Sequence, residues 1–367
     1  MKKLIVLIAA LLFGLPLSPA HSADPIVRIT SMTHQTFTGE FRNDELVQDL
    51  IPSGKLGLLV FTPPVKNTIW IIDAALIDEV IAMTGEYKLA TEATPAGKEI
   101  ATAWLMQLRK ITNGQQVIAL AYGNPDVALA QRLAPSELRR YYAFGKSQLE
   151  AALGRVVRSE PKGGWSTGKS ELSNPLRKAY SDNRKALTKL SRVVNDQQLI
   201  ALRAQLSKLL SPQLDKDSRE FYSYSASNAV DAMVNRLRIN SGRYQITTSN
   251  VDLPVTVINE FDTDVTISVL MMPNNSRLLV NSFDNVTIPA RSKKQLEMGV
   301  VVIAPGQTTV TALITDNEGN ELAPEASLNL NATVIDSRVT WFTTGAAILL
   351  LLAGVAQSLR RIKRRAL

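Results

Sequence analysis

No cysteine occurs in the sequence, and histidine occurs only twice. The absence of cysteine excludes disulfide bonds and thiolate metal sites, so packed cores must stabilise the fold. His21 lies in a segment that we expect to be removed, which leaves His34 as the one histidine of the mature chain. A single histidine excludes metal sites built from several histidines and supports no Ser-His-Asp triad.

A surplus of charge of one sign is also lacking over most of the chain. The formal net charge is +8, but two of the 41 Lys and Arg residues lie in the first 23 residues and five lie in the last eight. The remaining 34 are matched by 33 Asp and Glu residues. Because proteins bind nucleic acid through an excess of positive charge, we predict that no nucleic acid is a partner.

The N-terminus has the layout of a secretory signal. Lys2 and Lys3 precede an apolar run from Leu4 to Leu17, and mostly small residues follow before Asp24. The apolar run is too short to cross a bilayer comfortably. We therefore predict that residues 1–23 are a signal peptide that directs export and is then removed.

The C-terminus predicts one membrane span. Residues 339–359 contain no charged side chain, and at about 1.5 Å per residue such a helix covers the roughly 30 Å of the hydrocarbon layer. A cluster of cations follows and should hold the tail, residues 360–367, in the cytoplasm. These cations are Arg360, Arg361, Lys363, Arg364 and Arg365. We predict a single-pass plasma-membrane protein whose helix contacts membrane lipid and whose N-terminal domains lie outside the cytoplasm.

Residues 24–158 alternate between strand and helix signals. The apolar runs Thr68 to Ile72 and Val117 to Ala121 are typical of strands buried on both faces, and a helical pattern follows each of them. The stretch from Leu56 to Phe61 fits either a helix or a buried strand. This order predicts a parallel α/β unit.

The rest of the chain before the membrane span changes from helical to strand patterns. Residues 159–171 are rich in Gly, Ser and Lys and predict a linker loop. Residues 172–240 predict a segment of amphipathic helices that pack on one another or on the α/β unit. From residue 241 to 337 the hydrophobic period falls to two and turn residues recur, which predicts an all-β, immunoglobulin-like (Ig-like) sandwich without a disulfide.

Five stretches of the sequence together resemble a known family. They are Asn43–Leu46, Pro52–Leu56, Trp70–Leu76, Ala121–Val127 and Leu253–Asn259. The chain is similar to domain-of-unknown-function family 6049, a group of actinobacterial cell-envelope proteins. The resemblance implies a signal peptide, an α/β region, an Ig-like sandwich and a final membrane helix, and it implies no biochemical activity. Members are usually longer. The resemblance therefore implies that the N-terminal sandwich is reduced here to residues 26–33 and that the α/β unit, residues 24–158, is truncated after Gly154.

Residues 163–170 match the phosphate-binding pattern G-x-x-x-x-G-K-S. A functional phosphate loop needs a buried strand before it and a helix after it, so that backbone N–H groups face the phosphates. Polar residues precede this match, Asn174-Pro175 soon follow it, and we place the segment outside the cell. We therefore predict no nucleotide binding.

Asp73 and Asp126 fall at the ends of the two predicted strands, at the edge where α/β proteins place their sites, and Tyr122 lies between them in the sequence. Two carboxylates beside one cleft would suit a cell-wall glycan hydrolase or a deacetylase-like enzyme. Alternatively, both side chains cap the helices that follow them. An open cleft between the carboxylates favours the enzyme, whereas hydrogen bonds into the helix N-termini favour capping.

The predicted sandwich loops contain Asp262, Asp264 and Asp284, whose carboxylates are candidate ligands for calcium. Turns favour Asp for conformational reasons alone, so we predict no metal and no other cofactor. The leading hypothesis is a non-enzymatic protein that contacts other envelope proteins or cell-wall glycan at the outer face of the plasma membrane. The enzyme that uses Asp73 and Asp126 is the alternative.

Overall fold

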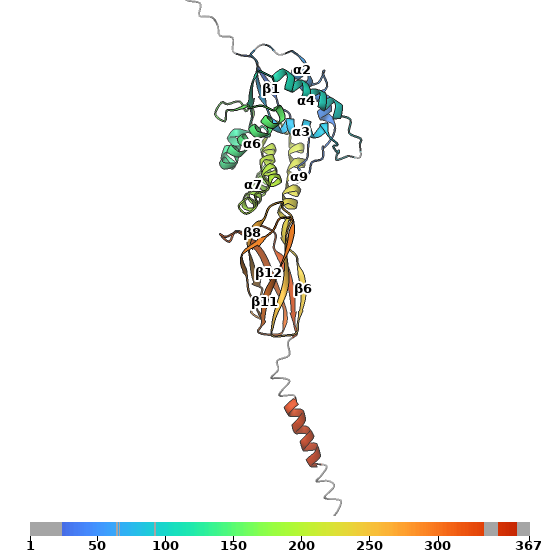
Figure 1. Ribbon diagram of the computed structural model, residues 1–367, viewed down its shortest axis with the longest axis vertical. Helices are drawn as coiled ribbons and strands as arrows, with labels where there is room; N and C mark the ends of the chain where they lie inside the picture. The colour runs from blue at the N-terminus through green and yellow to red at the C-terminus, as the bar shows by residue number, and fades with distance from the viewer. Residues whose placement is uncertain (1–23, 64, 66, 92, 334–343, 358–367) are drawn as a thin grey trace, which may run out of the picture.

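The computed structural model describes residues 24–63, 65, 67–91, 93–333 and 344–357. A parallel α/β unit, a group of helices and a two-sheet β domain follow one another along the long axis of the molecule (Figure 1). The predicted signal peptide, residues 1–23, and the basic tail, residues 360–367, lie outside the described residues.

The α/β unit is built on a parallel sheet in which successive strands are neighbours. Its strands are β1 (Ile26–Ile29), β2 (Ile69–Ile72), β3 (Gln116–Ala119) and β4 (Arg158–Ser159). The two strands expected from apolar runs are β2 and β3, and each is buried over its last three residues. Strand order without a reversal is the order found in (β/α)8 barrels, whose sites lie at the carboxyl ends of the strands.

Six helices connect and flank these strands in the described part of the unit. They are α1 (Glu45–Leu50), α2 (Lys55–Phe61), α3 (Ala74–Thr84), α4 (Lys98–Thr112), α5 (Val127–Leu133) and α6 (Pro135–Leu153). The stretch that the sequence left open is therefore a helix, α2. Its Leu56 and Val60 are buried, one turn apart, and the indole N–H of Trp104 on α4 donates to the Leu56 carbonyl at 3.1 Å.

Two short strands lie where the sequence predicted something else. β1 occupies the region that the family resemblance assigned to a reduced N-terminal sandwich, but it pairs in parallel with β2. β4 ends at Ser159, the first residue of the predicted linker 159–171. The side chain of Arg28 also donates to the carbonyl of Trp165, so this loop lies against the sheet. Strands of two to four residues are too short to show a hydrophobic period.

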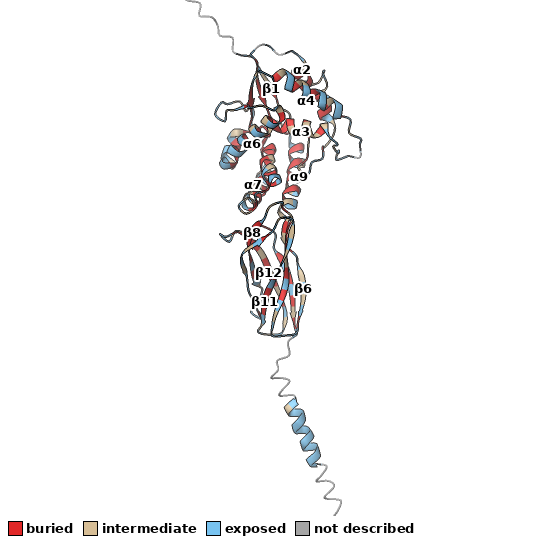
Figure 2. Cartoon of the chain, in the orientation of Figure 1, coloured by how far each residue is buried: buried red, intermediate tan, exposed pale blue. Residues whose placement is uncertain are grey.

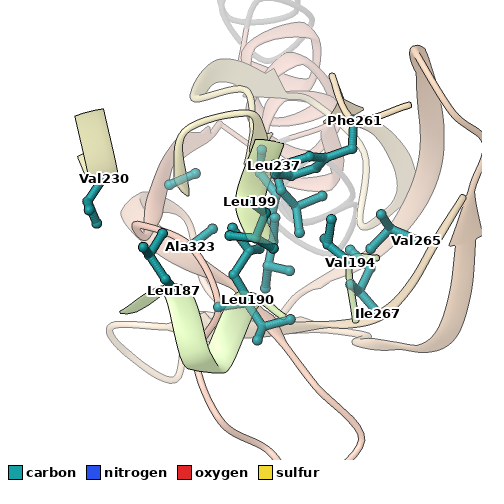
Figure 3. Packing of buried hydrophobic residues seen from close by; sticks show 14 of the residues in the cluster. Leu187, Leu190, Val194, Leu199, Val230, Leu237, Phe261, Val265, Ile267 and Ala323 are labelled. Atoms are coloured by element: carbon teal, nitrogen blue, oxygen red, sulfur yellow. The ribbon is translucent and has the colours of Figure 1, made fainter. Parts of the chain in front are cut away.

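The helical segment contains α7 (Asn174–Leu190), α8 (Gln197–Gln205), the 3₁₀ helix η1 (Leu206–Leu210) and α9 (Lys216–Val234). Asp196 caps α8, because its carboxylate accepts from the N–H groups of Gln198 at 2.8 Å and Leu199 at 3.2 Å. The helices pack on one another, and their apolar faces also join the core of the β domain. Figure 3 shows this shared core, in which Val194 lies near Val265 and Ile267 of the β domain, and Leu187, Leu190 and Phe261 belong to the same cluster.

The β domain has two sheets with strand orders β10-β8-β12-β13-β6 and β5-β7-β11-β9. The strands are β5 (Leu237–Ile239), β6 (Gly242–Ile246), β7 (Asn250–Asn259), β8 (Val265–Pro273), β9 (Leu278–Val280), β10 (Phe283–Ile288), β11 (Ser292–Val302), β12 (Gly306–Thr315) and β13 (Ala326–Ala332). The strands β5, β7, β11 and β9 are arranged like strands A-B-E-D of an immunoglobulin fold, and β8, β12 and β13 are arranged like strands C-F-G. The Ig-like prediction is confirmed, although β5 begins inside the range 172–240 that we expected to be helical.

The predicted membrane span is described only over residues 344–357, which are helical and almost entirely exposed (Figure 2). Residues 339–343 and 358–359 of the expected span lie outside the described residues. Among the helices that are described, none combines the length and the hydropathy needed to cross a bilayer.

Candidate functional site

The carboxyl edge of the parallel sheet is the natural place to look for a site, and Asp73 follows β2 there. The Asp73 carboxylate accepts from the N–H of Ala75 at 3.0 Å, which caps α3, and from the N–H of Gly123 at 2.9 Å. The side chain is buried. Burial raises the pKa of Asp73 to about 7, although the two N–H donors and the charge of Lys208 lower it. Asp73 therefore acts first as a helix cap that also fixes the turn after β3.

Asp126 follows β3 and is also buried. One carboxylate oxygen accepts from the N–H of Leu129 at 3.1 Å and caps α5, and the other accepts from the N–H of Ser170 at 2.9 Å. Both oxygens therefore accept hydrogen bonds from backbone N–H groups, one at a helix N-terminus and one in the loop after β4. The capping role that we weighed against catalysis accounts for Asp126 and for Asp73.

Tyr122 does not bridge the two aspartates. Its hydroxyl donates to Asp78 on α3 at 2.9 Å, and its ring packs edge-on against Phe144. Burial raises the pKa of Asp78 to about 6, although the hydrogen bond from Tyr122 lowers it. The partner of Tyr122 is thus a carboxylate that the sequence did not single out, and it is half-buried beside the buried tyrosine.

A buried ion pair lies at the same edge, between Glu79 on α3 and Lys208 on η1. The Lys208 ammonium donates to Glu79 at 2.8 Å, and the two side chains are 6% and 1% exposed, respectively. Glu79 also accepts from the Thr33 hydroxyl at 2.5 Å and from the His34 backbone N–H at 2.9 Å. Burial raises the pKa of Glu79, but the charges of Lys208 and His34 and the hydrogen bonds from Lys208 and Thr33 together outweigh burial, so the pKa is lowered. Burial lowers the pKa of the His34 imidazole.

Sequence reasoning missed this pair, although a signal for each residue exists. Glu79 lies on the apolar stripe of α3, one turn after Ala75 and one turn before Met83, where a carboxylate without a partner would be costly. Lys208 lies within the run Leu206–Leu210, whose other residues are three leucines and a serine. A charged residue inside an apolar stripe indicates a buried partner, but it does not say where that partner lies.

Residues 206–211, which we call the plug, cover this edge of the sheet. The Ser207 hydroxyl donates to the Tyr122 carbonyl at 2.5 Å, and the Asp126 N–H donates to the Leu210 carbonyl at 2.9 Å. Gly123 has a φ of +73°, and a Cβ added to it would lie 2.9 Å from backbone atoms of Lys208. The backbone of the plug therefore touches the turn after β3.

The plug is fixed from its other side by Arg219 on α9. Its guanidinium donates to the carbonyls of Leu209 at 2.8 Å, Ser211 at 3.0 Å and Leu214 at 2.8 Å, and to the Ser170 hydroxyl at 2.6 Å. Between the plug and the sheet, the cavity beside Asp73, Glu79 and Lys208 measures about 10 Å³. This is close to the smallest volume that holds one water molecule. A sugar residue does not fit there.

The segment 163–170 lacks the surroundings of a phosphate loop. β4 ends at Ser159, and α7 begins only at Asn174. The N–H of Gly163 donates to the Glu160 carbonyl at 2.9 Å, and the N–H of Ser170 is held by Asp126. These two backbone donors of the match are therefore already bound within the protein.

The candidate calcium ligands of the β domain are engaged with the protein or lie apart. Asp262 pairs with Arg291 at 2.5 Å, and Asp264 accepts from the N–H of Ala290 at 2.8 Å. Asp284 is exposed on β10. In the part of the chain that the structure describes, no three His, Cys, Asp or Glu side chains gather as a metal would require.

Comparison with known proteins identifies one family. The profile of a family of unknown function, DUF6049, matches residues 105–366. No protein with a curated description matches the chain.

Several solved structures resemble the chain over about a quarter of its length. WR4, a C. elegans MSP family member, is 13% identical over 27% of this chain and 98% of its own, with a TM-score of 0.21. An ASH/PapD-like domain of human CEP192 is 7% identical over 28% of this chain and 87% of its own, with a TM-score of 0.22. A CARDB domain from Pyrococcus furiosus is 15% identical over 26% and 94%, with a TM-score of 0.21. Likenesses at this level carry no argument about function, and the Ig-like assignment depends on the strand order.

Proposed function

Because the chain belongs to the family of unknown function DUF6049, which brings no activity with it, we propose a function that needs no chemistry at the sheet edge. The protein acts by binding, as a single-pass component of the cell envelope. Its α/β unit, helices and β domain lie at the outer face of the plasma membrane and contact other envelope proteins or cell-wall glycan.

The observation that carries this proposal is the plug. In a working α/β enzyme the carboxyl edge of the sheet is open to substrate. Here Lys208 forms an ion pair beneath that edge, and the cavity left is about 10 Å³. A glycosidase also needs two carboxylates that face one sugar, whereas Asp73 and Asp126 accept hydrogen bonds from backbone N–H groups. The same contacts weaken the alternative of a glycan hydrolase or deacetylase.

The location at the membrane is supported by the sequence alone. It depends on the export signal, the uncharged stretch 339–359 and the cations that follow it, Arg360 to Arg365. The cysteine-free chain allows a direct test, because a single introduced cysteine is the only site that a maleimide can label. Ser327→Cys places it on an exposed position of the β domain, and Ala366→Cys places it in the tail.

In intact cells, a membrane-impermeant maleimide should label the Ser327→Cys variant, and it should label Ala366→Cys only after permeabilisation. The reverse pattern would show that the orientation is wrong. The binding role is tested with Asp73→Asn, which keeps the cap on α3 and removes the carboxylate. This variant should restore function to a strain that lacks the gene. Loss of function in a folded Asp73→Asn protein would instead support the enzyme.

Partner identification completes the test. Crosslinking in intact cells, followed by identification of what the ectodomain contacts, should recover envelope proteins or cell-wall polysaccharide. Recovery of lipid and of the chain itself alone would count against a binding role.

A further inference from the structure

The outer face of the β domain carries a polar groove that no part of the proposal above assigns. It has a volume of about 620 Å³ and lies over β6, β13 and β12, beside the turn after β8. Its lining includes the polar side chains of Arg243, Gln245, Asn274, Gln307, Asn329 and Asn331. We call this surface the amide groove, because five of these side chains are Asn or Gln.

The strand register sets the amide groove in two rows. Asn329 on β13 is paired with Arg243 on β6 and with Thr309 on β12. Asn331 is paired in the same way with Gln245 and with Gln307. Residues two apart on a strand point to the same face, so both rows face outward on the same side of the sheet. Neighbouring strands lie about 4.8 Å apart, so each row presents polar groups at a regular spacing.

Much of the hydrogen-bonding capacity of the rows is unused within the described part of the chain. Gln245 accepts from the Asn331 amide at 3.2 Å, and Asn329 accepts from the Thr309 hydroxyl at 3.0 Å. These bonds orient the amides and leave the Nδ2 of Asn329 and the Oδ1 of Asn331 without a hydrogen bond to any described residue. The side chains of Arg243 and Gln307 form no hydrogen bond or ion pair with other described residues.

The chemistry of the groove selects a class of ligand. A side-chain amide both donates and accepts, and a sugar hydroxyl or acetamido group does the same, so rows of amides match a polysaccharide strand. Among the described residues, no carboxylate lines the groove, and Arg243 is the one charged residue in its lining. A single cation is a poor basis for binding a polymer of phosphates, which proteins hold with several.

A second groove on the β domain differs in chemistry. It has a volume of about 570 Å³ on the other sheet, and it is lined by the carboxylates of Asp252 and Glu297 and by apolar residues such as Leu279 and Val301. The concentration of neutral amides is therefore a feature of one sheet face and not of the domain as a whole.

We propose that the amide groove binds a polysaccharide strand of the cell wall through its hydroxyl and acetamido groups. This inference rests on the proposed function, because it names the partner class and the surface of the same binding protein. Arg243 and Asn329 form one row of contacts, and Gln245, Asn331 and Gln307 form the other.

The test uses the full chain in detergent and measures its co-sedimentation with insoluble peptidoglycan sacculi at moderate salt. The variant Arg243→Ala with Gln307→Ala removes one residue from each row, and neither side chain holds another described residue, so folding should be unaffected. The matched control is Lys293→Ala with Gln295→Ala on β11. It also removes one positive charge and one amide from exposed positions of the β domain.

We expect the groove variant to weaken binding by about tenfold or more, since several hydrogen bonds are lost, and the control to bind like the wild type. Equal binding by all three proteins would overturn the amide groove as the site and leave the binding role intact. If the wild type does not sediment with sacculi but crosslinks to envelope proteins in cells, the polysaccharide inference is wrong and the proposed function stands. If it does neither, both fail.

Discussion

Replacement of Lys208 by methionine should destabilise the α/β unit strongly. Methionine fits the space of the lysine stem, so the main change is the loss of the ammonium. The carboxylate of Glu79, whose side chain is 1% exposed, would then keep its charge without a cation or would take up a proton. Removal of one partner from a buried ion pair typically costs about 3 to 5 kcal/mol. We expect the lower end of this range, because the Thr33 hydroxyl and the His34 N–H still donate to Glu79.

A second substitution separates the ion pair from simple packing. Glu79→Gln keeps an acceptor for the donors around it and removes the negative charge. In the Lys208→Met, Glu79→Gln double variant no buried charge is left unpaired, so it should be more stable than Lys208→Met alone. We expect a coupling energy of at least about 1 kcal/mol, which lies within the range measured for contacting residues.

The assay is denaturant unfolding of the full chain in detergent, followed by tryptophan fluorescence. Trp70 and Trp104 are fully buried in the α/β unit and report on its transition. Lys216→Met is the matched control, because Lys216 begins α9 at an exposed position. A loss below about 1 kcal/mol for Lys208→Met, equal to that of the control, would refute the reasoning. It would mean that Lys208 is solvated and that the plug does not cover the sheet edge.

Substitutions at three further positions test the same region. Asp73→Asn should gain stability relative to the wild type between about pH 5 and pH 8, as measured by unfolding at both values. The pKa of Asp73 rises from 3.8 to about 7 on folding. The stability that the protonated Asp73 contributes is therefore present at low pH and is lost as the pH rises through about 7. A constant difference across this range would contradict the raised pKa. Gly123→Ala should lower the free energy of unfolding by at least about 2 kcal/mol and increase amide exchange in the plug. A positive φ is unfavourable for alanine, and its Cβ would lie 2.9 Å from Lys208. Unchanged exchange would show that the plug is not in contact with this turn. Asp126→Ala should cost about 1 to 2 kcal/mol through the lost cap on α5, and Asp126→Asn, which still caps, should recover most of it in the same unfolding assay.

Local sequence signals determined the elements whose causes lie within a few residues. The apolar runs at β2 and β3 predicted buried parallel strands. Asp73 and Asp126 predicted helix starts, because a cap needs only a side-chain oxygen and N–H groups two or three residues later. A hydrophobic period of two predicted the sandwich, since alternate residues of a strand reach the same core.

The tertiary structure decided what lies beyond that local range. Whether Leu56 to Phe61 would be helix or strand depended on packing against Trp104. The pairing of Glu79 with Lys208 joins residues 129 positions apart, and no periodicity within α3 or η1 specifies it. The plug over the sheet edge and the two rows of the amide groove arise in the same way. Each brings side chains together across elements, so its residues are defined only once the helices and strands have packed in one register.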